Sequence, residues 1–126
     1  MTRLRIPLAV FVFIVVFFSF RNSTQAGFAD PGQTTFEKRC TGCHSLDKNK
    51  EGPRLRGIYG RHSASVSDFG YSAALKKANL LWNDDSLNKW LKDPESLAPD
   101  NDMAFHVSDP KEREDIIAYL KSQSPK

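Results

Sequence analysis

The chain has 126 residues, of which 18 are Lys or Arg and 15 are Asp or Glu, for a formal net charge of +3. Three of the basic residues (Arg3, Arg5 and Arg21) precede residue 27, and no acidic residue does, so the remaining 100 residues carry 15 charges of each sign. The length fits one small domain, and a balanced charge gives no electrostatic support for nucleic-acid binding.

The first element is an uncharged apolar run of 15 residues, Ile6–Phe20, which follows a basic start and precedes small polar residues. This order is typical of a secretory signal, with cleavage predicted after Ala26 or Ala29. As a helix the run would span only about 22 Å, less than the roughly 30 Å of a hydrocarbon core. The alternative is an uncleaved anchor. In both cases residues 1–26 are predicted to be the leader and residues 27–126 to form an exported domain.

Beyond the leader, the sequence predicts an all-α domain with long loops. Helices are expected in 30–40, 71–80, 84–94 and 108–124. Asp30 and Asp109 are predicted caps, each followed by Pro at the first helical position, and Glu112 adds a capping-box-like start to the last helix. The predicted apolar faces are Leu87, Trp90 and Leu91 in the third segment, and Ile116, Ile117, Tyr119 and Leu120 in the fourth.

Both cysteines lie in the stretch RCTGCHS, as Cys40 and Cys43, with His44 directly after them. Thiols three positions apart followed by an imidazole are typical of covalent haem attachment, in which the histidine becomes an axial iron ligand. A thiol redox pair would be expected in a βαβ context, and a zinc site needs more ligands than the neighbourhood offers. A structural pair of buried thiols explains neither the spacing nor the histidine. A covalent haem would also complete the small core of this loop-rich domain.

The second axial position has few candidates. Met103, in a loop before the last predicted helix, is the only methionine beyond the leader. His62 and His106 are the rival ligands, and an open site, as in a gas sensor or peroxidase, is the remaining alternative. A haem without a sixth ligand would indicate an enzyme or a gas sensor and not an electron carrier.

From Gly32 to Lys121 the chain resembles class I cytochromes c of the mitochondrial or short bacterial type. The resemblance rests on several pieces in family order: GQTTFEKRCTGCHS, GPRLRGIYGR, FGYSAAL, LLW, LNKWLKDP, PDNDMAF and REDIIAYLK. It implies the cytochrome c fold, with several helices and long loops around one covalently bound haem. Gly32, Phe36, Tyr119 and Leu120 would then form the crossing of the first and last helices.

The resemblance also implies roles for individual residues. Cys40 and Cys43 would carry the thioethers, and His44 and Met103 would ligate the iron. The carbonyl of Pro53 would accept a hydrogen bond from the second ring nitrogen of His44. The side chains expected near the haem propionates are Arg61, Tyr71 and Trp82.

Three positions depart from the family pattern near the methionine. Trp90 stands where many relatives have a tyrosine, and an indole donates a hydrogen bond but does not accept one. Leu75 replaces a common asparagine, and Asn101 replaces a common threonine. Trp90 and Asn101 are therefore further candidate cofactor-binding residues, with an altered network around the sulfur.

The resemblance implies a one-electron carrier, not an enzyme. Its partners would be redox proteins such as a quinol:cytochrome c reductase, a terminal oxidase or another dehydrogenase or reductase. The predicted location is the bacterial periplasm, either free or anchored through residues 6–20 as a membrane-bound subunit of an oxidoreductase complex. Mitochondrial relatives carry a ring of lysines, whereas this chain keeps Arg39 in one such place and has Glu95, Asp100, Asp102 and Asp109 around the methionine.

Overall fold

The computed structural model describes residues 29–126, and the predicted leader, residues 1–26, lies outside this range. The elements are α1 (Pro31–Cys40), α2 (Ala73–Ala78), α3 (Asp84–Lys92), the 3-10 helix η1 (Pro94–Ser96) and α4 (Pro110–Ser122). The predicted all-α class is confirmed, since extended pairing in the described part is limited to one isolated bridge between His62 and Leu81. None of these helices is long and apolar enough to cross a lipid bilayer.

Two of the predicted caps begin the helices as expected. The side chain of Asp30 accepts a hydrogen bond from the Gly32 N–H at 2.9 Å. Asp109 does the same for the Lys111 N–H at 2.8 Å. Both caps satisfy donors that the first helical turn leaves without partners, so the boundaries of α1 and α4 follow from local chemistry.

The capping box predicted in α4 is wrong, and one forms in α3 instead. The carboxylate of Glu112 pairs with Arg39 of α1 at 2.7 Å and does not turn back to its own helix start. In α3, Asn83 accepts from the Ser86 N–H while the Ser86 hydroxyl accepts from the Asn83 N–H, each at 2.9 Å. Glu112 forms the ion pair and not the capping box because the packing of α1 against α4 brings the Arg39 guanidinium beside its carboxylate.

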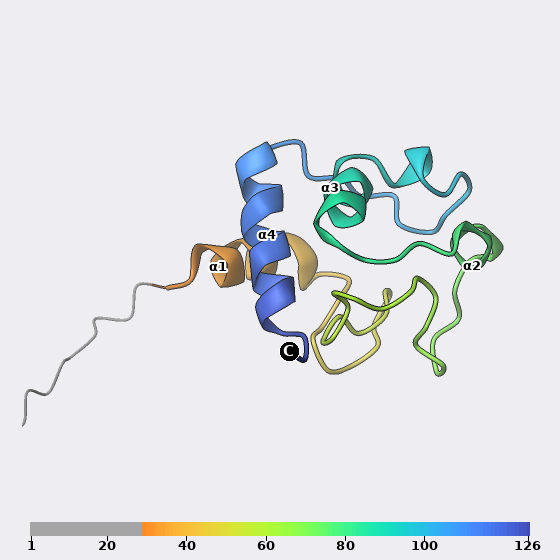
Figure 1. Ribbon diagram of the computed structural model, residues 1–126, viewed down its shortest axis with the longest axis horizontal. Helices are drawn as coiled ribbons and strands as arrows, with labels where there is room; N and C mark the ends of the chain where they lie inside the picture. Colours follow the sequence, from red (N-terminus) through yellow and green to blue (C-terminus); the bar gives the residue numbers. More distant parts are fainter. Residues whose placement is uncertain (1–28) are drawn as a thin grey trace, which may run out of the picture.

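The crossing of α1 and α4 forms as predicted (Figure 1). A Cβ on Gly32 would lie 2.3 Å from the Asp115 carbonyl oxygen and 2.8 Å from the Tyr119 Cβ, so only glycine lets the two backbones approach this closely. The rings of Phe36 and Tyr119 pack with centroids 5.2 Å apart, and Leu120 is buried beside them.

The core lies between α4, α3 and the loops that enclose them. All the side chains predicted for the two apolar faces are buried: Leu87, Trp90, Leu91, Ile116, Ile117, Tyr119 and Leu120. Trp82, two residues before the start of α3, packs edge-on against Trp90 at a centroid distance of 5.4 Å. The apolar faces of α3 and α4 therefore share one core.

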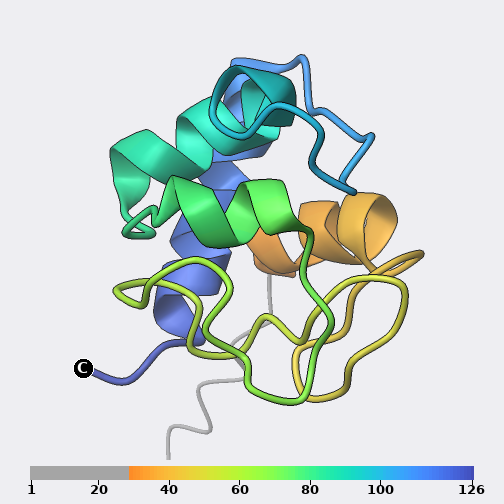
Figure 2. The same ribbon diagram turned by 90° about the vertical axis from the view of Figure 1, so that its right-hand side faces the viewer.

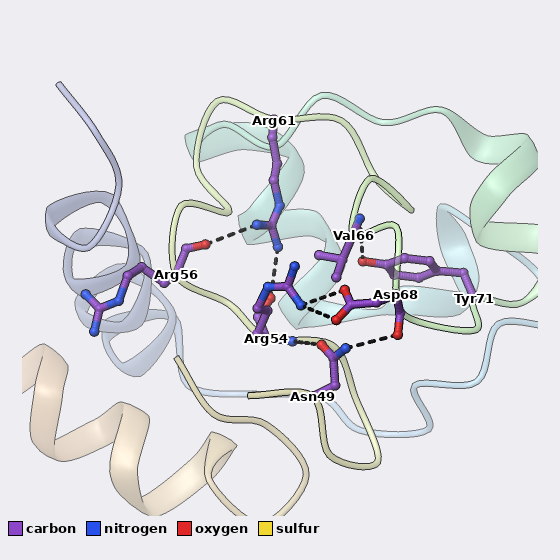
Figure 3. A network of polar contacts seen from close by, with 7 residues as sticks. All are labelled: Asn49, Arg54, Arg56, Arg61, Val66, Asp68 and Tyr71. Atoms are coloured by element: carbon purple, nitrogen blue, oxygen red, sulfur yellow. Dashed lines mark hydrogen bonds and ion pairs between the residues drawn. The ribbon is translucent and has the colours of Figure 1, made fainter. Parts of the chain in front are cut away.

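The long connection between α1 and α2 runs as loops below α2 in Figure 2. Polar contacts fix these loops (Figure 3): Arg54 pairs with Asp68 at 2.6 Å, and Asn49 donates to the Asp68 carbonyl at 3.2 Å. The Arg61 guanidinium donates to the carbonyls of Arg54 and Arg56 at 2.9 and 3.0 Å. Side chains thus replace the hydrogen bonds that regular structure would supply.

A buried arginine holds the loop that precedes α4. Arg113 donates to the carbonyl oxygens of Val107 and Ser108 and to Asn88 Oδ1, each at 2.8 Å. Because Asn88 belongs to α3, this one side chain joins the end of the loop to both helices. The charge is dispersed over three oxygen acceptors.

Candidate functional site

A cavity of about 690 Å³ opens between the loops and the inner faces of α3 and α4. Its volume lies within the range of about 300–1,000 Å³ that is usual for cofactor and ligand sites. All ten side chains singled out from the sequence line it: Cys40, Cys43, His44, Pro53, Arg61, Tyr71, Trp82, Trp90, Asn101 and Met103. The structure therefore brings residues from a span of more than sixty positions to one place.

The cysteine–histidine motif forms a tight turn at the end of α1. The N–H groups of His44 and Cys43 donate to the Cys40 carbonyl at 2.8 and 3.2 Å, so all three side chains face the cavity. Cys40 and Cys43 do not form a disulfide with each other, and burial raises the pKa of Cys40 to about 11 despite the neighbouring Arg39. The raised pKa keeps the Cys40 thiol protonated at neutral pH, which does not favour a redox-active thiolate at this position.

His44 is held in one orientation by the backbone of Pro53. Its Nδ1 lies 2.8 Å from the Pro53 carbonyl oxygen, which accepts a hydrogen bond from the Nδ1–H group, so that the Nε2 lone pair is available to a metal. Burial lowers the pKa of His44 below its ordinary 6.5; the Pro53 hydrogen bond opposes this effect, and the charge of Lys50 adds to it. The imidazole is thus neutral at pH 7, the form in which it ligates iron.

Two residues that the sequence analysis did not single out shape this side of the cavity. A Cβ on Gly52 would lie 2.2 Å from His44 Cε1, so the imidazole occupies the space that any other residue would need. Lys50 donates through Nζ to the carbonyl oxygens of Thr41 and Gly42 and closes the loop after the motif. A glycine directly before Pro53 was the available signal for Gly52, whereas nothing local indicated Lys50.

Met103 is fixed at both its sulfur and its backbone. The Trp90 indole N–H donates to Met103 Sδ at 3.0 Å, and the Asn101 side-chain oxygen accepts from the Met103 N–H at 2.8 Å. Trp90 and Asn101 therefore both act on the methionine, and Asn101 does so through the backbone. The sulfur keeps a second lone pair with which it can ligate a metal.

The three side chains expected near propionates lie along the same cavity. Burial lowers the pKa of Arg61, Tyr71 opposes this effect and the charge of Arg54 adds to it. The side chain still stays charged at neutral pH because a guanidinium is not deprotonated in proteins. The Tyr71 hydroxyl accepts from the Val66 N–H at 3.3 Å and keeps its own proton to donate. Trp82 is buried with its ring against Trp90. Arg61 and Tyr71 supply donors suited to carboxylates.

The rival histidines occupy different positions. His62 is exposed, is bridged to Leu81 and also lines the cavity. His106 is exposed and does not belong to the lining. Of the two histidines, only His62 lies where it could replace Met103 as an iron ligand. The Met103 sulfur is the better-fixed donor atom because it accepts a hydrogen bond from Trp90.

These residues fit a covalently held haem. The wall offers two thiols, a neutral imidazole with a free nitrogen, a fixed thioether and a large apolar surface from the core. Such a donor set matches the His/Met ligation that is known for cytochromes c. Within residues 29–126, no group of three or more His, Cys, Asp and Glu side chains comes together as zinc binding would require.

Comparisons with known proteins agree with this geometry. The family described as Cytochrome c matches residues 29–124. A cytochrome c of Euglena viridis is 46% identical over 99 residues, which cover 76% of this chain and 97% of that protein. A cytochrome c of Gibberella zeae is 40% identical over 97 residues, with 74% of this chain and 92% of that protein covered.

A solved structure is similar in both fold and sequence. Cytochrome cH from Methylobacterium extorquens superimposes with a TM-score of 0.69 and is 40% identical, covering 73% of this chain and 95% of that chain. The share of each relative that is matched means that the similarity covers nearly whole proteins and not a fragment of them.

Proposed function

Because this chain belongs to the cytochrome c family, and is an electron carrier with covalent haem c, we propose that His44 and Met103 are its two axial ligands. The observation that carries the proposal is the convergence of both donors, with Cys40 and Cys43, on one cavity. The chain would shuttle electrons one at a time between redox proteins and bind no substrate.

When bound, the haem supplies an iron that cycles between two oxidation states. Cys40 and Cys43 would hold the group by thioether bonds, and the Pro53 carbonyl orients His44. The Trp90 N–H withdraws electron density from the Met103 sulfur. The buried walls keep water away and disfavour additional positive charge, which with a thioether ligand raises the reduction potential.

Absorption spectra of the purified protein test this ligand set. We expect the oxidised protein to show a methionine–iron charge-transfer band near the red edge of the visible range. We expect the reduced protein not to bind carbon monoxide at neutral pH, because both axial positions are filled. Carbon monoxide binding together with a missing band would instead support the alternative, a haem enzyme or gas sensor with an open sixth position.

We propose that the surface beside Met103 selects partners of positive charge. The segment 93–109 contains no Lys or Arg and five exposed acidic residues, which are Asp93, Glu95, Asp100, Asp102 and Asp109. None of these five carboxylates forms an ion pair with another described residue. Asp102 and the exposed Phe105 also line the cavity. Arg39, which keeps a basic place in sequence, is neutralised by Glu112. Complementary charge steers association, so a reductase, oxidase or dehydrogenase partner should present a basic surface here.

Small redox reagents of opposite charge test the sign of this surface. Oxidation of the reduced protein by tris(phenanthroline)cobalt(III), a trication, should slow as salt is added, and oxidation by ferricyanide should accelerate. Asp100→Asn with Asp102→Asn should reduce both salt effects, whereas Glu114→Gln, an exposed change on α4, should leave them nearly unchanged. Equal salt dependence in the wild type and the double variant would contradict the proposal.

We propose a location on the outer side of a bacterial cytoplasmic membrane. Arg3 and Arg5 before the apolar run favour an inside N-terminus, which places the domain outside the membrane. Cleavage would release a periplasmic carrier; retention would tether the domain to partners in the same membrane at a high effective concentration.

The mass and fractionation of the haem-stained protein separate these cases. We expect it in periplasmic extract at the mass of the cleaved chain plus one haem. Recovery only in washed membranes at full-chain mass would mean an anchored cytochrome. Haem-stained protein confined to a bacterial cytoplasm would contradict export altogether.

A further inference from the structure

The turn that presents Met103 contains a strained residue. Asp100 has φ of +66°, in the left-handed region that residues with side chains seldom adopt. Such a conformation persists where surrounding contacts hold it. Within the turn, Asn101 donates to the Ala98 carbonyl through its N–H at 3.1 Å and through its side-chain amide at 2.9 Å.

One carboxylate outside the turn reaches both Asp100 and Asn101. Glu95 Oε2 accepts from the Asp100 N–H at 3.1 Å, and Glu95 Oε1 accepts from the Asn101 side-chain amide at 3.0 Å. Glu95 lies in η1 (Pro94–Ser96), where the adjacent Pro94 is buried and fixes the backbone. Among the described residues, Glu95 pairs with no Lys or Arg, so its two oxygens serve the turn.

The contacts continue from Asn101 to the methionine. With its amide nitrogen held by Glu95 and Ala98, Asn101 turns its side-chain oxygen to the Met103 N–H at 2.8 Å. The sulfur at the other end of that residue accepts from Trp90. Loss of the carboxylate would leave the Asn101 amide nitrogen held by the Ala98 carbonyl alone, and so loosen the backbone that directs the sulfur.

We propose that Glu95 is a positioning residue for Met103, acting through Asn101 and the Asp100 turn. The proposal rests on Met103 being the proposed axial ligand, but the hydrogen-bond chain exists in the protein independently of that role. Glu95 thus has a function inside the molecule in addition to its charge on the surface.

The first test compares Glu95→Ala and Glu95→Gln in the full holoprotein. In Glu95→Ala we expect the Met103 amide to exchange its hydrogen about 10-fold faster, on the scale of one lost hydrogen bond, and the red-edge band to disappear at a lower temperature than in the wild type. Glu95→Gln retains one acceptor oxygen of two and should be intermediate. Far-UV circular dichroism should stay unchanged, because η1 and the helices do not depend on this side chain.

Two further variants separate positioning from general destabilisation. Asn101→Ala removes the intermediary, so adding Glu95→Ala to it should change Met103 exchange and the band much less than Glu95→Ala does alone. Glu114→Ala removes an exposed carboxylate from α4 and should leave both readouts at wild-type values. Unchanged Met103 exchange in Glu95→Ala, or effects that add fully in the double variant, would overturn the proposal.

Failure of the proposed ligand set would be recognised separately. A wild-type protein without the red-edge band, which binds carbon monoxide when reduced, would show that Met103 is not a ligand. Met103 amide exchange in the Glu95 variants would still report whether the carboxylate holds the turn.

Discussion

Met103→Ala is expected to leave the haem attached, lower the reduction potential by roughly a few tenths of a volt, and open the sixth position to carbon monoxide. The shift is a fraction of the about 0.8 V over which axial ligands set haem potentials. A thioether favours the reduced iron, and alanine leaves the position to water, which favours the oxidised iron. Protein film voltammetry and spectra of the reduced protein with and without carbon monoxide measure the two effects.

The rival histidines provide the matched controls for this change. His62→Ala tests the histidine that lines the cavity, and His106→Ala tests the one that does not. Neither change should move the potential or remove the red-edge band. If Met103→Ala left both properties unchanged while His62→Ala altered them, the ligand would be His62.

Replacement of both cysteines, Cys40→Ala with Cys43→Ala, is expected to abolish covalent attachment and to leave most of the chain unfolded. The core is built around a cavity of about 690 Å³. At about 24 cal/mol per Å³, leaving the whole of that volume unfilled would cost about 17 kcal/mol, which exceeds the 5–15 kcal/mol that holds a typical domain together.

Mass spectrometry and circular dichroism together measure this result. The denatured wild-type protein should carry the mass of one haem, and the double variant should carry none and lose helical signal. Ser45→Ala, beside the motif, should keep both the added mass and the helical signal. A double variant that still carried covalent haem would show that the attachment does not use these thiols.

Much of the fold could be predicted because its determinants are local. Asp30 and Asp109 cap helices through atoms two positions away, and the buried faces of α3 and α4 follow from spacings of three and four residues. The Glu112 prediction failed because a partner 73 positions away, Arg39, competed for its carboxylate.

The sequence by itself determined which chemical groups this protein has for binding a haem: two thiols one helical turn apart, an imidazole next to the second, and one methionine beyond the predicted leader. These features are readable because each depends on residue type and short spacing. Only the tertiary structure decided that Gly52 makes room for His44, that Trp90 donates to the Met103 sulfur, and that Glu95 holds Asn101. Those contacts depend on the course of loops whose sequences have no periodic pattern. The course of such a loop is determined by packing between residues far apart in the chain and not by neighbouring residues.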